Sequence, residues 1–272
     1  KDKRWGSSDR KFVAETIYEI VRWKRLYTEI AEVKDPFTRD DIWRIFAVWA
    51  VLRGIKLPDW KYFEGTPTRK IKGRFDELTK IRKFKEAIPD WIDELGLKEL
   101  GKEVWEKELT AQNEQAKVIL RVNTLKTTKE KVRAILMDNN IETELIKDQP
   151  DALVLKERAN VFMIPAFKEG FYEVQDASSQ LVAYFLDVKP GMRVVDTCAG
   201  AGGKTLHLAS LMENKGQLIA MDIYESKLKQ LKIRAKRNGV FNAEFRVIDS
   251  TKVIKKLYDK ADRVLIDAPC SG

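Results

Sequence analysis

The chain has 272 residues, of which 44% are hydrophobic and 34% are charged. That apolar share is too high for a disordered chain, and no run of roughly 18 uncharged apolar residues is present that would span a membrane. Its two cysteines, Cys198 and Cys270, argue against a disulfide framework, and its single histidine, His207, argues against the usual metal sites and a Ser-His-Asp triad. We therefore expect a globular protein of the reducing cytoplasm, with no membrane partner and no metal.

Lysine and arginine number 51 against 42 aspartates and glutamates, which gives a net charge of +9 and a pI of about 9.3. An excess of this size suits a polyanionic partner, above all nucleic acid. A basic surface without any specific partner explains the same charge equally well. Charge alone therefore leaves both interpretations open.

The first part of the chain is typical of a helical bundle. All seven tryptophans lie in the first 105 residues, and apolar residues recur at helical spacing through residues 8–31. Thr38 and Asp41 form the pattern of a capping box before a helix over 41–53, which Gly54 ends. Shorter helices are predicted over 71–81, 83–88, 90–95 and 102–113. The expected unit is a small all-helical bundle whose aromatic side chains form its core.

Residues 117–171 change in character and predict a small α+β unit. Strands are predicted over 118–122, 141–146 and 152–155, and a helix over 128–139 begins at a threonine cap. This β-α-β-β order suits a sheet that carries RNA on one face, although the segment has no aromatic RNP-type motif. A plain spacer between two domains is the alternative interpretation.

Strands and helices alternate regularly after residue 191. The predicted strands are 193–197, 217–222, 244–248 and 263–267, and the helices between them are 204–212, 225–238 and 251–258. This alternation is typical of a parallel, doubly wound α/β sheet. Four parallel strands that stop at a strand-end loop make an incomplete sheet, so we expect the natural protein to continue past Gly272.

The loop after the first of these strands, DTCAGAGGK over 196–204, is rich in glycine. Glycines allow the backbone to approach a ligand closely at the carboxyl edge of a parallel sheet. The loop matches neither the phosphate-binding P-loop nor the GxGxxG motif, because Cys198 and Thr205 stand where those motifs need glycine. On its own, the loop is weak evidence for a nucleotide site.

Acidic residues follow three successive strands at the same predicted edge. Asp222 ends the second strand, Asp249 follows the third and Asp267 ends the fourth. A carboxylate after the second strand is the usual acceptor for ribose hydroxyls in nucleotide-like sites. Because the third and fourth strands also contribute, the arrangement fits S-adenosylmethionine better than NAD. Each aspartate taken singly also fits a helix cap or a loop residue.

The last six residues, DAPCSG over 267–272, place Cys270 beside the predicted cofactor site. Methylation at carbon 5 of a pyrimidine needs a thiolate that adds to carbon 6, and a carboxyl group at the N3 edge of the ring stabilises the adduct. Asp267 and Cys270 supply those two groups, and chemical logic alone nominates Cys270 as the nucleophile. A small buried apolar residue is the alternative interpretation of an isolated cysteine.

Three segments together, QDASSQ (175–180), DTCAGAGGKT (196–205) and DAPCSG (267–272), resemble the Sun/RsmB-type RNA (cytosine-5)-methyltransferases. The resemblance covers nearly the whole chain. It implies a NusB-like helical RNA-binding domain over 1–113, an RRM-like N1 segment over 114–172 containing LRVNTLK, and a Rossmann-like class I methyltransferase domain over 173–272, incomplete at its C-terminus. It also implies S-adenosyl-L-methionine as cofactor and RNA, in particular ribosomal RNA, as partner. A monomer is the default expectation.

The resemblance further implies a role for each site residue. Cys198, Ala199, Gly200, Ala201, Gly202, Gly203 and Lys204 would line the methionine and ribose part of the cofactor. Asp222 would hold the ribose hydroxyls, Asp249 would lie by the adenine, and Lys227 matches a basic position near the cofactor. Asp267 would contact the target cytosine, with its backbone near the cofactor.

Two departures from the family pattern matter. The usual loop is CAAPGGK, whereas here it is CAGAGGK, and without the proline we expect a looser loop. The family also uses two active-site cysteines. The nucleophile belongs to a Thr-Cys motif on a later strand, and the cysteine of the DAPC motif, here Cys270, assists release of the product. Since the later motif would follow Gly272, the chain as given is expected not to turn over.

Three rival functions remain open at this level. A non-catalytic RNA-binding or ribosome-assembly factor would keep the same fold. An amino-group methyltransferase usually has a (D/N)PP(Y/F)-type loop, which DAPC does not match, and a dinucleotide oxidoreductase needs a third glycine that the glycine-rich loop lacks.

His207 is predicted to be a packing or surface residue. The basic run over 227–237 is predicted to be the solvated face of a helix or a contact for RNA phosphate.

Overall fold

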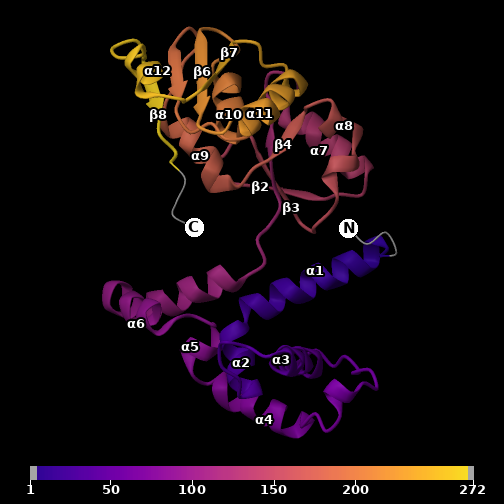
Figure 1. The fold of residues 1–272 in the computed structure, drawn as a ribbon. Coiled ribbons are helices and arrows are strands. Elements are labelled where there is room, and N and C mark those ends of the chain that lie inside the picture. Colours follow the sequence, from indigo (N-terminus) through magenta and orange to yellow (C-terminus); the bar gives the residue numbers. More distant parts are fainter. Residues whose placement is uncertain (1–4, 269–272) are drawn as a thin grey trace. The chain divides into compact units, whose positions relative to one another are not determined.

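The computed structural model describes residues 5–268. The chain forms two compact units, Lys1–Gln115 and Ala116–Gly272. The elements described in the first unit are all helical, and both sheets belong to the second (Figure 1). The division into three domains, with boundaries after residues 113 and 172, stays a prediction.

The first unit contains α1 (Ser7–Arg22), α2 (Lys24–Ala31), α3 (Arg39–Leu52), the 3-10 helix η1 (Lys61–Phe63), α4 (Thr68–Leu78), α5 (Arg82–Lys85) and α6 (Asp90–Asn113). The predicted capping box is confirmed at the start of α3. The Thr38 hydroxyl accepts a hydrogen bond from the Asp41 amide at 3.2 Å, and the Asp41 carboxylate accepts one from the Thr38 amide at 3.0 Å. Just after α3, Gly54 adopts a φ of +68°, which ends the helix.

The prediction of one helical run over 8–31 is wrong in one respect, because the run is broken at Trp23. This residue has φ −102° and ψ 19° and separates α1 from α2. Both helices pack on one core that includes Ile20 and Leu26, so the apolar spacing continues across the break and conceals it. In α6 the two predicted stretches run together, although Gly101 has non-helical angles of φ 73° and ψ 165° between them.

The antiparallel sheet of the second unit is built from β1 (Ile119–Val122), α7 (Lys129–Asp138), β2 (Thr143–Leu145), β3 (Ala152–Leu155), η2 (Val161–Met163), α8 (Pro165–Lys168) and β4 (Tyr172–Val174). Its strand order is β2-β3-β1-β4. The three predicted strands and the helix with its Thr128 cap are confirmed. The β-α-β-β-α-β order along the chain is the ferredoxin-like topology.

Strand β4 is an element that the sequence pattern did not reveal. It has only three residues, too few for alternation to register. It extends the sheet on the free side of β1, where it pairs Glu173 with Arg121 and Tyr172 with Val122. Two opposite charges therefore face each other across adjacent strands.

The parallel sheet follows, with α9 (Ala177–Phe185), β5 (Arg193–Asp196), α10 (Gly203–Leu211), β6 (Gln217–Asp222), α11 (Glu225–Asn238), β7 (Ala243–Val247), α12 (Thr251–Lys255) and β8 (Arg263–Leu265). The strand order is β7-β6-β5-β8 and every pairing is parallel, which confirms the predicted α/β sheet. Strand β8 ends two residues earlier than predicted, so Asp267 lies in the following loop. Helix α9 was not predicted.

The two central strands of the parallel sheet, β5 and β6, are buried on both faces, as the crossover connections require. Val194, Leu218, Ile219 and Ala220 have no more than a trace of exposed surface. Within the part of the chain that the structure describes, no helix is long and apolar enough to cross a membrane.

Candidate active site

The glycine-rich loop runs from the end of β5 to the start of α10, and two of its glycines need left-handed backbone angles. Gly200 has φ +54° and Gly202 has φ +93°. A Cβ atom on Gly202 would lie 2.0 Å from Leu231 Cδ1, whereas one on Gly200 would meet nothing within 4 Å. Gly202 therefore lets the loop pack against α11, and Gly200 leaves open space beside the backbone.

Asp222 ties this loop to the neighbouring strand. It lies at the carboxyl end of β6 and is only 7% exposed. One carboxylate oxygen accepts a hydrogen bond from the Gly200 amide and the other accepts one from the Tyr224 amide, both at 2.8 Å. Each oxygen keeps a further lone pair, so the carboxylate can still accept hydrogen bonds from a ligand.

Lys204 and Asp267 meet across the end of the sheet. The Lys204 ammonium, in the first turn of α10, lies 2.6 Å from a carboxylate oxygen of Asp267 in the loop after β8. Their side chains are 20% and 46% exposed. An ion pair with this much solvent access contributes at most about 1 kcal/mol. Both groups are therefore accessible at this edge and only weakly held to each other.

Asp196, at the carboxyl end of β5, is a site residue that the sequence interpretation did not single out. Its carboxyl group is buried, accepts a hydrogen bond from the Thr205 hydroxyl at 2.7 Å and another from the Cys198 amide at 3.3 Å. Burial raises the pKa of Asp196 to about 6, against the two hydrogen bonds, which lower it. The available signal was its position, since it ends β5 as Asp222 ends β6.

The remaining predicted site residues lie in several places. Cys198 is half-buried, Ala199 is buried, and Asp249 is exposed two residues after β7, at the same edge of the sheet. Lys227 is exposed on α11, with its ammonium 5.1 Å from the centroid of the Tyr224 ring. Cys270 lies outside the described residues.

His207 is confirmed as a packing residue. Its side chain is fully buried and meets the Tyr184 ring edge-on, with the ring centroids 4.9 Å apart. Burial lowers the pKa of His207, so the imidazole is neutral near pH 7. Within residues 5–268, no group of three or more histidine, cysteine or acidic side chains is arranged to hold a metal ion.

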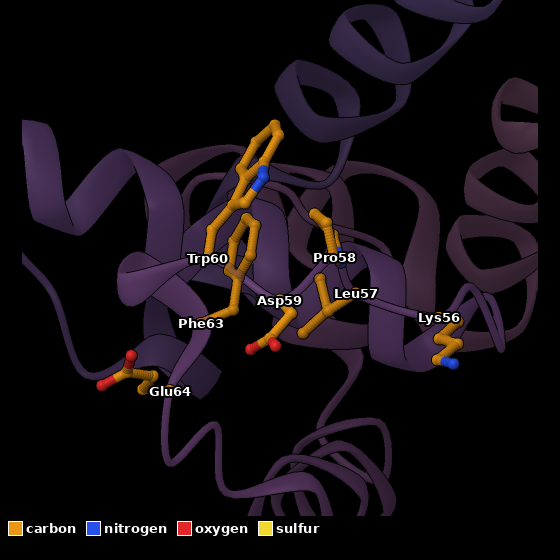
Figure 2. Close-up of a pocket in the computed structure, with 7 residues that line it drawn as sticks. All are labelled: Lys56, Leu57, Pro58, Asp59, Trp60, Phe63 and Glu64. Carbon is orange, nitrogen blue, oxygen red and sulfur yellow. The ribbon is translucent and has the colours of Figure 1, made fainter.

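A hollow of about 530 Å³ in the first unit lies beside the chain that follows α3 (Figure 2). The rings of Trp60 and Phe63 stack there with their centroids 5.9 Å apart. Lys56 and Glu64 stand apart from these rings and from each other in Figure 2. Because its polar groups do not converge, this hollow is a weaker candidate than the edge of the parallel sheet.

Comparison with known families matches two segments of the chain. The model of the family described as 16S rRNA methyltransferase RsmB/F matches residues 183–272, and the model of the RsmF/B-like ferredoxin-like domain matches residues 88–162. The "Probable ribosomal RNA small subunit methyltransferase B" of Synechocystis sp. is 35% identical over 188 residues, which are 68% of this chain and 42% of that protein. The ribosomal RNA small subunit methyltransferase B of Pseudomonas syringae is 33% identical over 187 residues, 68% of this chain and 41% of that protein. The match thus spans about two fifths of the length of these relatives.

Solved structures resemble the chain over a larger share. The crystal structure of PH0851 is 28% identical with a TM-score of 0.75, and the match covers 99% of this chain and 67% of that one. A methyltransferase homolog protein from Pyrococcus horikoshii is 29% identical with a TM-score of 0.64, over 72% of this chain and 64% of that one. NSun6 from Pyrococcus horikoshii, solved with SFG, shares the fold at 22% identity and a TM-score of 0.62, over 68% of this chain and 71% of that one. The α/β sheet is therefore a methyltransferase fold.

Proposed function

Since the chain belongs to the Sun/RsmB family of methyltransferases, we propose that it takes part in the S-adenosylmethionine-dependent methylation of ribosomal RNA. The observation that carries the proposal is the junction of Gly200 and Asp222 at the carboxyl edge of the parallel sheet. This edge is where open α/β sheets bind nucleotide-like ligands. Because the match spans only part of the relatives, the activity of the whole protein is part of the proposal.

The residues present fit S-adenosylmethionine. The open space beside Gly200 leaves room for a ligand at the backbone, and the Asp222 carboxylate has lone pairs for two hydroxyl donors. We propose that residues 198–204 hold the methionine and ribose part, Asp222 the ribose hydroxyls and Asp249 the adenine, with Lys227 nearby. When bound, the cofactor supplies an electrophilic methyl group on a sulfonium.

We further propose carbon 5 of cytosine as the methylated atom. A thiolate that adds to carbon 6 makes carbon 5 nucleophilic, and after methylation the carbon 5 proton leaves to a base and the thiolate departs. The nucleophilic thiolate is expected from a Thr-Cys motif on a strand after β8. Asp267 is proposed to hold the N3 edge of the ring and Cys270 to assist release. The target base must leave its stack to reach these groups.

A basic groove of about 620 Å³ on the second unit supports RNA as the partner. Its cationic side chains come from the segment after β1, from α8 and from the last turns of α11: Lys126, Lys168, Lys236 and Arg237, beside the acidic Glu169. Arg237 is paired with Glu173, so the exposed Lys168 and Lys236 are the cations best placed for phosphate. The exposed Ile233 and the half-buried Phe171 add apolar surface. Clustered cations with apolar surface between them suit a phosphate backbone and its bases. We also propose that the helical first unit is NusB-like and that the antiparallel sheet is RRM-like, both in support of RNA binding.

Replacing Lys168 and Lys236 together by glutamine is expected to weaken RNA binding and to make it less sensitive to salt. Both lysines are exposed in the groove, and each phosphate that the protein no longer neutralises reduces the slope of log K against log salt by about 0.7 for single strands. Fluorescence anisotropy at several salt concentrations measures this slope. The double variant K156Q/K215Q removes two exposed lysines paired with Glu142 and Glu213 outside this groove and is the control. Equal slopes in the two double variants would remove the groove from the proposal.

The function itself is tested with protein that contains this chain together with the segment expected after it. The protein is incubated with unmodified ribosomal RNA and methyl-labelled S-adenosylmethionine, and the labelled nucleoside is identified by mass spectrometry. Labelled 5-methylcytidine is the expected product. Label on another nucleoside would refute methylation of cytosine but would still support methyltransferase activity. No label, with cofactor binding intact, would favour an assembly factor that retains the fold.

A further inference from the structure

The middle of the glycine-rich loop has no polar side chain of its own with which to hold its shape. From Ala199 to Gly203 it is Ala-Gly-Ala-Gly-Gly, so no side chain in this stretch is longer than a methyl group. Such a sequence loses much conformational entropy when it is ordered. This stretch can therefore form hydrogen bonds only through its backbone amides and carbonyls. The Gly200 amide donates to Asp222, the Ala199 amide to the Met221 carbonyl, and the Gly202 amide to the Ala199 carbonyl.

Two arginine side chains bind two of these carbonyls. Arg234 of α11 donates from Nη1 to the carbonyl of Ala201 at 2.7 Å. Arg121 of β1 donates from Nη1 to the carbonyl of Gly203 at 2.5 Å. The two carbonyls lie on either side of Gly202, the glycine that packs against Leu231. Hydrogen bonds from a charged donor are about twice as strong as neutral ones, so these contacts restrain the loop at its tightest point.

Glu173 on β4 binds Arg234 and lies opposite Arg121 in the antiparallel sheet. Its side chain is only 3% exposed, and it accepts a hydrogen bond from Arg234 Nη2 at 2.9 Å. Arg237 and Asn238, also on α11, donate to its other oxygen. Arg121 is its cross-strand neighbour and is itself 1% exposed, and its guanidinium donates to the Gln175 side chain as well as to the Gly203 carbonyl. One carboxylate of the antiparallel sheet is thus the ion-pair partner of Arg234 and a favourable neighbouring charge for Arg121.

The charges of this cluster depend on one another. Burial alone raises the pKa of Glu173, but its positively charged and hydrogen-bonding neighbours outweigh burial and hold that pKa below its usual value. Burial lowers the pKa of Arg121 to about 10, which leaves it positive at neutral pH. A buried ion cluster is a poor way to gain stability, since apolar replacements of similar volume are often as stable or more so. Its contacts to the loop suggest a positional role instead.

We propose that Arg121, Glu173 and Arg234, the loop-bracing cluster, are positioning residues through which the antiparallel sheet sets the affinity for S-adenosylmethionine. None of the three needs to touch the cofactor. They fix the loop carbonyls, and the amides of the same short loop then face the bound ligand in a preorganised geometry. The inference rests on the proposed function, because it assigns the loop to cofactor binding.

The substitution Glu173→Gln tests this cluster with little change in shape. It removes the counterion, and we expect binding of S-adenosylmethionine to weaken about tenfold, equivalent to ~1.4 kcal/mol. In the cofactor-free chain, amide hydrogen exchange in peptides covering residues 197–206 should become faster. The milder variant Arg234→Lys keeps a positive charge opposite Glu173 but cannot also bridge to Ala201 through a fork of two nitrogens. It carries the test if the first variant fails to fold.

Tyr172→Phe is the matched control, because it is equally conservative in shape and lies on the same strand as Glu173. It removes a buried 2.8 Å hydrogen bond from the Tyr172 hydroxyl to the carbonyl of Val161, which belongs to η2 and not to α11 or the loop. It should destabilise the chain but leave loop exchange and cofactor affinity unchanged. If both cluster variants show the same loop amide exchange and the same cofactor affinity as this control, the proposed bracing is wrong. Affinity is measured with the longer protein used for the functional test, and its failure to bind S-adenosylmethionine without any substitution would instead overturn the proposed function, while loop exchange would still report on the bracing.

Discussion

Replacing Gly202 by alanine is expected to lower the free energy of unfolding by about 2–5 kcal/mol, the sum of a left-handed backbone penalty and local overpacking. The residue has φ +93°, and its new Cβ would lie 2.0 Å from Leu231 Cδ1 and 3.1 Å from Leu231 Cγ. Leu231 is fully buried and cannot swing into solvent. The loop must move away from α11, which separates Ala201 from Arg234. Urea unfolding measures the stability, and calorimetric titration with S-adenosylmethionine measures the binding.

Gly200→Ala is the matched control within the same loop. Gly200 also has a positive φ, +54°, but a Cβ there would meet nothing within 4 Å. Only the backbone penalty of about 1–2 kcal/mol is expected. The new methyl group would nevertheless occupy the open space assigned to the cofactor, so binding should weaken more than stability falls. Equal losses of stability in the two variants would contradict the role of the contact with Leu231.

The parts of the site that the sequence predicts are those set by local rules. Parallel strands present their carboxyl ends at one edge, so the convergence of Asp222 and the glycine-rich loop follows from the strand pattern alone. The pairing of Lys204 with Asp267 joins residues 63 apart in sequence, yet both follow adjacent strands, β5 and β8, and they meet for the same reason. Strand order and edge position are enough to bring these groups together.

The loop-bracing cluster could not be predicted in this way, because no periodic pattern links its members. Glu173 lies on a strand of three residues, and its bond to Arg234 spans 61 residues of sequence. The signal available in the sequence was Arg121, a charged residue inside the otherwise apolar strand Ile119–Val122. That signal shows that a buried charge needs a partner, but only the packing of the two sheets identifies which one.

Asp196→Asn is expected to stabilise the chain at high pH and to have little effect at low pH. The pKa of Asp196 is about 6 in the folded chain against an ordinary 3.8, so the folded state binds the proton more tightly than the unfolded state. The associated stability is fully present below pH 3.8 and is lost as pH rises through 6. About two pKa units correspond to roughly 3 kcal/mol. Asparagine avoids this ionisation, keeps an acceptor for the Cys198 amide and offers an amide to the Thr205 hydroxyl.

Urea unfolding from pH 4 to pH 8 measures the difference in unfolding free energy between Asp196→Asn and the unsubstituted chain. This difference isolates Asp196, because all other carboxyl groups titrate in both proteins. The variant should be the more stable above pH 6, and the gap should close toward pH 4. Asp176→Asn gives the opposite sign, because the hydrogen bond from the Ser178 hydroxyl lowers the pKa of Asp176. There the unsubstituted chain should be more stable at neutral pH, with the advantage lost as pH falls. A gap for Asp196→Asn that stays constant with pH would mean that Asp196 titrates normally and that water reaches its carboxyl group.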